Sequence, residues 1–164
     1  MTRTWTRRDV LRLSGAALTT PYLVPSAALG LDGSTPPSET VRVGIIGCGG
    51  RARWMCQRDM ADVKGIQVVA ACDCQRQRAE EFVQQVAGDA RWGVYDDFRA
   101  MIEKEKLDAV MAETTTHARA YVTIVAMQMG MDVYIEKPMC LTIAEGRAMV
   151  NAARKLGRVT QVGT

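Results

Sequence analysis

Short apolar runs alternate with amphipathic stretches along the chain from residue 41 onward. The apolar runs are too short for helices, and most are apolar throughout, which is typical of strands that are buried on both faces of a sheet. We expect five such strands and a sixth, with a weaker signal, at residues 91–94. The five are residues 41–46, 66–72, 107–112, 133–135 and 159–162.

The stretches between these runs have the spacing of helices. Residues 117–129 are apolar on most sides, which suits a helix packed against a sheet. Thr142 and Glu145 have the spacing of a capping box, and Gly157 would end the helix that begins there. Strands that alternate with helices predict an α/β fold with a doubly wound parallel sheet. A further helix is indicated by a stripe at i, i+3, i+4 and i+7, made by Ala79, Phe82, Val83 and Val86.

A glycine-rich loop follows the first expected strand and opens a helix. Gly47 permits a tight turn, Gly49 leaves room for a pyrophosphate, and Ala52 lets the helix pack closely on the strand. The start of that helix offers unpaired N–H groups and a partial positive charge to phosphates. The loop has the G-x-G-x-x-A pattern of dinucleotide-binding sheets and consists of Gly47, Cys48, Gly49, Gly50, Arg51 and Ala52.

An acidic residue, Asp73, ends the second expected strand. It lies about 20 residues beyond the glycine loop, where a carboxylate commonly binds the ribose of the adenosine. Loop, helix and acid together predict a Rossmann-type NAD-binding domain. The alternative is a plain glycine turn, with Asp73 as a helix cap. Asp73 favours NAD because it would repel a 2′-phosphate, but Arg76 and Arg78 could pair with such a phosphate, so NADP stays open.

A second motif, Tyr-Ile-Glu-Lys-Pro, occupies residues 134–138. With the glycine loop, it resembles the Gfo/Idh/MocA oxidoreductases, which act mainly on sugars, polyols and related compounds; the resemblance covers residues 41–164. It implies that Lys137 lies beside nicotinamide and substrate and assists proton transfer, as an ammonium near a reacting hydroxyl can. Glu136 would orient Lys137 or pack near the cofactor, and Pro138 would fix the turn. By themselves Glu136 and Lys137 could equally be a surface ion pair.

The loop after the fourth expected strand departs from this family. Ala112 and Glu113 stand in place of the usual Thr-Pro, but His117 keeps its place at the start of a helix. His117 is the one histidine of the chain. We predict it as a second catalytic candidate that positions cofactor or substrate, although a lone histidine is often a structural hydrogen-bonding group.

The resemblance also implies a larger C-terminal substrate domain, which the sequence lacks. Either the sequence is a fragment or a separate partner supplies the rest, and the 164-residue chain alone should bind the dinucleotide with little or no turnover. The expected substrate is a small carbohydrate, and a homo-oligomer is possible for the full-length protein. The family also contains NAD-dependent glycosidases, and a non-catalytic NAD-binding protein is the third hypothesis.

The first forty residues do not follow the strand and helix pattern. Residues 6–12, Thr-Arg-Arg-Asp-Val-Leu-Arg, precede a mildly apolar stretch and resemble a twin-arginine export signal. This predicts a signal segment at 1–28 and export to a bacterial periplasm, the alternative being a disordered basic terminus. Residues 29–40 are polar and rich in turn-forming residues, which predicts a linker before a folded domain at 41–164.

Charge and cysteine content exclude other classes of function. The net charge is +3, and all of that surplus lies in residues 1–28, so the rest is neutral, which argues against nucleic-acid binding. After export, no association with a membrane is expected. The five cysteines lack the spacing of a zinc site, and we predict no metal. They are expected to be structural, although Cys72 and Cys74 could form a redox pair.

Overall fold

The computed structural model describes residue 26 and residues 35–164. It divides the chain into two units, Met1–Pro37 and Ser38–Thr164, and the second contains the folded domain. The twin-arginine-like segment lies outside the described residues, apart from the single residue 26, and so does the first half of the expected linker. No helix among the residues described has the length and apolar character needed to cross a membrane.

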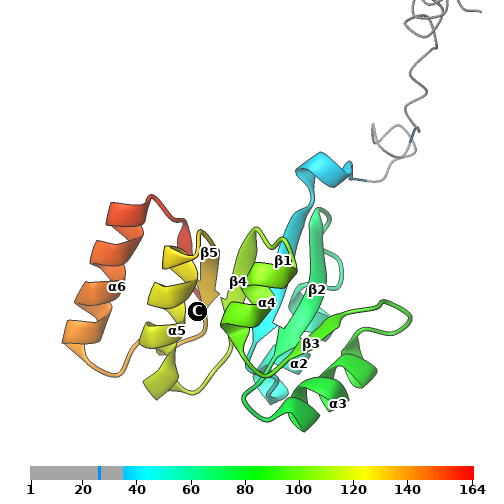
Figure 1. The fold of residues 1–164 in the computed structure, drawn as a ribbon, viewed down its shortest axis with the longest axis horizontal. Coiled ribbons are helices and arrows are strands. Elements are labelled where there is room, and N and C mark those ends of the chain that lie inside the picture. The colour runs from blue at the N-terminus through cyan, green and yellow to red at the C-terminus, as the bar shows by residue number, and fades with distance from the viewer. Residues whose placement is uncertain (1–25, 27–34) are drawn as a thin grey trace, which may run out of the picture. The chain divides into compact units, whose positions relative to one another are not determined.

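Six parallel strands form one sheet in the order β3-β2-β1-β4-β5-β6 (Figure 1). The order reverses at β1, which pairs with both β2 and β4, and this reversal is the topological switch point of a doubly wound sheet. The expected Rossmann-type fold is therefore confirmed. The strands are β1 Val41–Ile46, β2 Ile66–Cys72, β3 Gly93–Tyr95, β4 Ala109–Ala112, β5 Asp132–Ile135 and β6 Thr160–Val162.

Helices cover both faces of the sheet, which explains why the strands are apolar throughout. Neighbouring residues of one strand enter different cores: Ile46 and Val110 pack in one, Ile45 and Met111 in the other. Parallel strands are joined by crossover segments, and here the helices in these segments pack on both faces of the sheet. The helical segments are η2 Pro37–Glu39, α2 Gly50–Trp54, the π-helical η3 Met55–Asp59, α3 Arg76–Val86, α4 Phe98–Lys104, α5 Thr116–Gln128 and α6 Ile143–Leu156.

The expected limits of α6 are confirmed by its capping contacts. The Thr142 hydroxyl accepts a hydrogen bond from the Glu145 N–H at 3.2 Å, and the Glu145 carboxylate accepts one from the Thr142 N–H at 3.0 Å. Gly157 ends the helix in the left-handed conformation, with φ of 62°. Both ends of α6 are thus set by local side-chain and backbone chemistry.

Helix α4 was not expected, and β4 is shorter than the apolar run that predicted it. Asp97 caps α4 by accepting a hydrogen bond from the Arg99 N–H at 2.9 Å. Met101 and Ile102 are buried against the sheet. The helix has only seven residues, so its apolar positions do not form a period that can be detected in the sequence. Leu107 is buried although it precedes β4. An apolar run in the sequence indicates which residues are buried, but it does not show whether they belong to a strand or to the turn before it.

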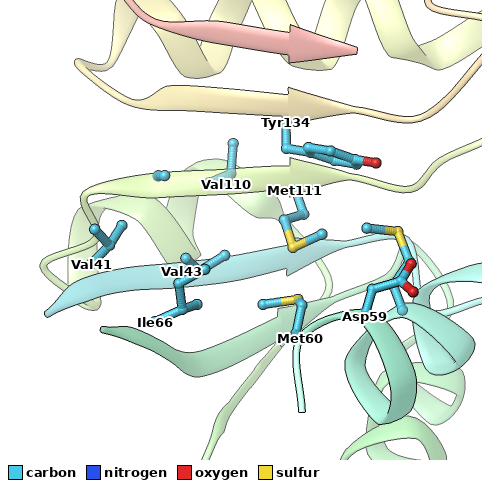
Figure 2. A pocket seen from close by; sticks show the side chains of 10 residues that line it. Val41, Val43, Asp59, Met60, Ile66, Val110, Met111 and Tyr134 are labelled. Atoms are coloured by element: carbon cyan, nitrogen blue, oxygen red, sulfur yellow. The ribbon is translucent and has the colours of Figure 1, made fainter. Parts of the chain in front are cut away.

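An apolar groove of about 350 Å³ lies against one face of the sheet (Figure 2). Figure 2 shows Val43 of β1, Met111 of β4 and Tyr134 of β5 along it, with Met60 on the far side. Asp59 is the one charged residue of its lining. The groove therefore brings together no set of acids, bases or nucleophiles.

Candidate functional site

Four strands end at one edge of the sheet, and each is followed by a residue with a candidate role or a polar side chain. Gly47 follows β1, Asp73 follows β2, Glu113 follows β4 and Glu136 follows β5. Each donates its backbone N–H to a carbonyl of the neighbouring strand, so its position is fixed by the sheet. The donor–acceptor distances are 2.8 Å for Gly47 to Cys72, 3.1 Å for Asp73 to Tyr95, 2.8 Å for Glu113 to Ile46 and 3.2 Å for Glu136 to Ala112.

Gly47 occupies a position that only glycine fits well. Its φ is +98°, and a Cβ there would lie 2.8 Å from backbone atoms of Glu113 and Thr114. The turn after β1 is therefore packed against the loop that follows β4. The tight turn predicted from the glycine pattern is present, at the switch point of the sheet.

The other glycines of the loop face open space. A Cβ at Gly49 or Gly50 would meet nothing within 4 Å. Gly49 is the N-cap of α2, and Ala52 is only 1% exposed, packed between helix and sheet. The first N–H groups of a helix have no partner within it. The backbone at the start of α2 is thus open to an approaching group.

Asp73 lies against the glycine loop. One oxygen of its carboxylate accepts a hydrogen bond from the Cys48 N–H at 3.0 Å, and the other accepts one from the Gln75 N–H at 3.0 Å. A carboxylate has about four acceptor positions, so these two bonds orient it and leave capacity for further donors. The sequence predicts Asp73 near this loop, and in the structure its carboxylate is hydrogen-bonded to Cys48 of the loop.

A cavity of about 320 Å³ opens beside this carboxylate, between the loops after β1, β2 and β4. Gly47, Asp73 and Arg78 contribute to its lining, together with Thr115 and His117 from the start of α5. The imidazole of His117 is exposed, and its Nε2 lies 3.4 Å from the Thr115 hydroxyl. His117 thus shares a cavity with Asp73.

Lys137 lies in a different pocket. Its lining consists of Arg51, Arg119, Glu136, Lys137 and Thr164. None of these five lines the cavity beside Asp73, so the two predicted catalytic residues, His117 and Lys137, are not brought together in one hollow. The side chain of Lys137 is exposed and forms no ion pair within the described part of the chain.

Glu136 is 3% exposed and binds two neighbours. One carboxylate oxygen accepts a hydrogen bond from Arg51 Nε at 2.5 Å, and the other accepts one from the Lys137 N–H at 2.7 Å. Burial alone would raise the pKa of Glu136, but these hydrogen bonds hold it below its usual value. Glu136 therefore fixes the backbone of Lys137 and pairs with Arg51, so it is not a salt-bridge partner of the Lys137 ammonium.

Arg119, which was not predicted as a site residue, holds the same turn from the other side. It is 9% exposed, although it lies in the apolar helix α5. Its guanidinium donates to the Thr114 carbonyl at 2.8 Å and to the Pro138 carbonyl at 2.6 Å. The loop after β4 and the Glu-Lys-Pro turn are thereby joined. A charged residue on the buried face of an apolar helix was the available signal for this role.

Glu113 is a second buried carboxyl group near this turn. It is 9% exposed, and neither of its oxygens has a hydrogen-bond partner among the described residues. Burial raises the pKa of Glu113 to about 7, and the charge of Glu136 adds to the effect, while Arg51 and Arg119 oppose it. Near neutral pH this side chain is close to half protonated.

The five cysteines are all free thiols. Cys48 and Cys72 are buried, and burial raises the pKa of each to about 12, so they stay protonated and unreactive. Cys74 is exposed. The described residues contain no group of three or more His, Cys, Asp or Glu side chains arranged to hold a metal ion.

Comparison with protein families assigns this domain. The model of an oxidoreductase family with an NAD-binding Rossmann fold, GFO_IDH_MocA, matches residues 41–164. This chain belongs to the Gfo/Idh/MocA oxidoreductase family. The glycine loop, Asp73 and the Glu-Lys-Pro turn described above all lie within the matched part of this Gfo/Idh/MocA domain.

Individual curated proteins are similar to much of the chain. The inositol 2-dehydrogenase of Salmonella typhimurium is 30% identical over 125 residues, which are 76% of this chain and 37% of that protein. A glycosyl hydrolase family 109 protein of Solibacter usitatus is 29% identical over 165 residues, covering 93% of this chain and 37% of that protein.

Solved structures agree with this assignment. A dehydrogenase from Chromobacterium violaceum superimposes with a TM-score of 0.70 and 29% identity, covering 76% of this chain and 36% of that one. The chain thus spans little more than a third of the length of the proteins it matches.

Proposed function

We propose that this chain binds NAD at the carboxyl edge of β1, β2 and β4 and serves as the cofactor domain of an oxidoreductase that acts on a hydroxyl group of a sugar or polyol. One observation carries the proposal. The carboxylate of Asp73 is hydrogen-bonded to the glycine loop at Cys48 and borders a cavity at the switch point of the sheet. Ligands of open α/β sheets bind at such points.

The residues of this edge fit a dinucleotide. The helical run from Gly50 to Asp59, made of α2 and η3, begins with free N–H groups and with no side chain at Gly49 or Gly50. A pyrophosphate would be held there by backbone N–H groups and the helix dipole. The remaining acceptor positions of Asp73 would receive the ribose hydroxyls.

We propose NAD over NADP as the preferred cofactor. Asp73 would repel a 2′-phosphate at the place where that phosphate would lie. Arg76 forms an ion pair with Glu80 at 3.0 Å, which engages its guanidinium. Arg78 remains as one cation on the cavity wall, so the discrimination against NADP should be moderate.

Bound NAD would supply hydride transfer, and the proton chemistry is proposed for Lys137. Its backbone is fixed by Glu136, its turn by Arg119, and its ammonium is unpaired within the part of the chain that is described. An unpaired ammonium next to a reacting hydroxyl can stabilise the developing alkoxide or move its proton. For His117 we propose a positioning role toward the adenosine end, because it shares the cavity of Asp73.

The substrate class and the activity of a longer protein are also proposals. The relative named inositol 2-dehydrogenase supports a polyol or sugar substrate. The relative named as a glycosyl hydrolase supports a second candidate, an NAD-dependent glycosidase, and its match covers more of this chain than that of the inositol enzyme. A non-catalytic NAD-binding protein would be distinguished by a Lys137→Gln variant that leaves the biological activity intact.

Calorimetric titration of the purified chain with NAD, NADH and NADP tests the proposal. We expect saturable binding of NAD and NADH and weaker binding of NADP. A folded sample that binds none of the three would contradict it. For a longer protein that contains this domain, hydrolysis of a glycoside without net formation of NADH would favour the glycosidase over the dehydrogenase.

A further inference from the structure

We propose that the pocket beside Lys137 binds a negatively charged group of the substrate, so that the substrate is a sugar carrying a carboxylate or a phosphate. The inference rests on the proposed function, because it names the class of substrate for the same site. Its basis is the set of charges that line the pocket, together with the way in which Arg119 is held there.

The pocket contains more positive than negative side chains. Arg51, Arg119 and Lys137 line it with one acidic side chain, Glu136, and with Thr164. Arg51 and Glu136 pair with each other and cancel. Arg119 has only carbonyl partners, and Lys137 has no acidic partner among the residues described. Arg119 and Lys137 therefore form no ion pair among the residues described, although the charges of Glu113 and Glu136 act on Arg119.

The remaining acidic group nearby does not remove this excess. Glu113 does not line the pocket, and its two oxygens bind no group in the described part of the chain. Burial raises its pKa to about 7, so near neutral pH it carries only part of a charge. An anionic ligand in the pocket would meet a positive surface.

Arg119 is held in a fixed position, which favours direct hydrogen bonds to an anion over a weak long-range attraction. It is 9% exposed and fixed by hydrogen bonds of 2.8 Å and 2.6 Å to two loops. A guanidinium has five N–H donors in a rigid fork, and the two carbonyls do not use all of them. A carboxylate or phosphate could accept the remaining donors, with the flexible ammonium of Lys137 as a second partner.

This anion site is separate from the place proposed for the adenosine. The pocket of Lys137 shares no lining residue with the cavity beside Asp73. The pocket of Lys137 is lined by the segments after β1, β4, β5 and β6, and Arg51 belongs to the first turn of α2. We expect a bound sugar acid to be compatible with NAD, because the adenosine would occupy the other hollow.

The test is an NMR titration of the purified chain, which detects weak binding through the backbone amide signals. The probes are D-glucuronate, glucose 6-phosphate and the neutral methyl glucoside, each at constant ionic strength and up to tens of millimolar, with and without saturating NAD. We expect saturable shifts at the amides near Lys137 and Arg119 for one or both of the acidic probes. The shifts should persist with NAD, and the neutral sugar should produce none.

Variants assign the effect to the two cations. Lys137→Gln and Arg119→Gln should each weaken binding of the acidic probe by about tenfold, the loss of one charge-assisted contact. Lys137 is exposed, so its variant will fold even if removal of the buried Arg119 disturbs the turn. Lys155→Gln removes one exposed cation of α6 outside the pocket and should have no effect.

Two results would overturn this inference while the proposed function stands. One is NAD binding without any saturable shift from either acidic probe, or with equal shifts from the neutral sugar. The other is loss of the anion-induced shifts when NAD is bound, which would assign both cations to the phosphates of the cofactor. Failure of NAD itself to bind would instead contradict the proposed function.

Discussion

Arg51 and Glu136 form an ion pair across 85 positions of the chain, and this pair connects the glycine loop to the Glu-Lys-Pro turn. Arg51 lies in the first turn of α2, and its guanidinium also lies 4.7 Å from the ring centroid of Trp54. Glu136 in turn holds the backbone of Lys137. The cofactor loop and the proposed catalytic turn are therefore one connected structure, and a change in either should affect the other.

Removal of Arg51 should destabilise the domain. Arg51→Gln leaves the buried Glu136 carboxylate without its charged partner, so we expect a measurable loss in the free energy of unfolding. Urea denaturation measures it. Arg76→Gln is the matched control, because it breaks the exposed pair with Glu80 and should cost within about 0.5 kcal/mol. Equal losses in the two variants would contradict the role of Arg51 as the partner of the buried Glu136.

A double variant separates the ion pair from other effects of Arg51. In Arg51→Gln with Glu136→Gln, no buried charge is left unpaired. Part of the stability lost in the single Arg51 variant should therefore return, with a coupling of about 1 kcal/mol or more. Strictly additive losses would show that the two side chains act independently.

Gly47→Ala should destabilise the turn after β1. Its φ of +98° is strained for alanine, and the added Cβ would lie 2.8 Å from the backbone after β4. We expect a loss of about 2–4 kcal/mol in the free energy of unfolding. Gly50→Ala, where a Cβ meets nothing within 4 Å, should leave the stability nearly unchanged and yet weaken NAD binding by occupying the open space. A stable Gly47→Ala variant would contradict the close approach.

The fold could be predicted from the sequence because its signals are local. The limits of β1 and β2 are marked by a polar segment before the first and by the glycine loop and Asp73 after them. The capping box at Thr142 and the glycine at 157 define α6 in the same way. The expected bounds of β3 and β4 were shifted and α4 was not expected, because short segments leave too few residues for a period to show.

The candidate site could be predicted only in part. Asp73 and Gly47 follow from their place in a known strand–loop–helix pattern. The pairing of Arg51 with Glu136 depends on how the loops after β1 and β5 sit across β4, a relationship that no local pattern contains. The separation of His117 from Lys137 into two hollows depends on the same packing, and so does the contact of Arg119 with the proline carbonyl.

Glu113 should make stability depend on pH. Its pKa in the folded state, raised to about 7, exceeds the pKa of a glutamate in the unfolded chain. At a pH between these two values, the folded state therefore keeps a proton that the unfolded state has lost. The contribution of Glu113 to stability is then fully present below about pH 4.5 and is lost as pH rises toward about 7, by about 3 kcal/mol in all. Glu113→Gln, which resembles the protonated form, should remove this dependence and be the more stable protein above about pH 7.

Urea denaturation across this pH range checks the role of Glu113. Glu103→Gln is the control, because Glu103 is exposed in α4 and its removal should leave the pH dependence of the wild type in place. If the Glu113 variant keeps the wild-type dependence, the carboxyl group is not buried and protonated as described.

The proposed NAD site depends on the Asp73 carboxylate beside the glycine loop, and calorimetric titration of NAD into the wild type and Asp73→Asn tests it most directly. Asparagine keeps an oxygen for the Cys48 N–H but loses the charge that binds the ribose hydroxyls. We predict NAD affinity lower by about tenfold or more, with a smaller loss for NADP, and no change in the exposed control Asp89→Asn. Unchanged NAD affinity in a folded Asp73→Asn protein would contradict the account.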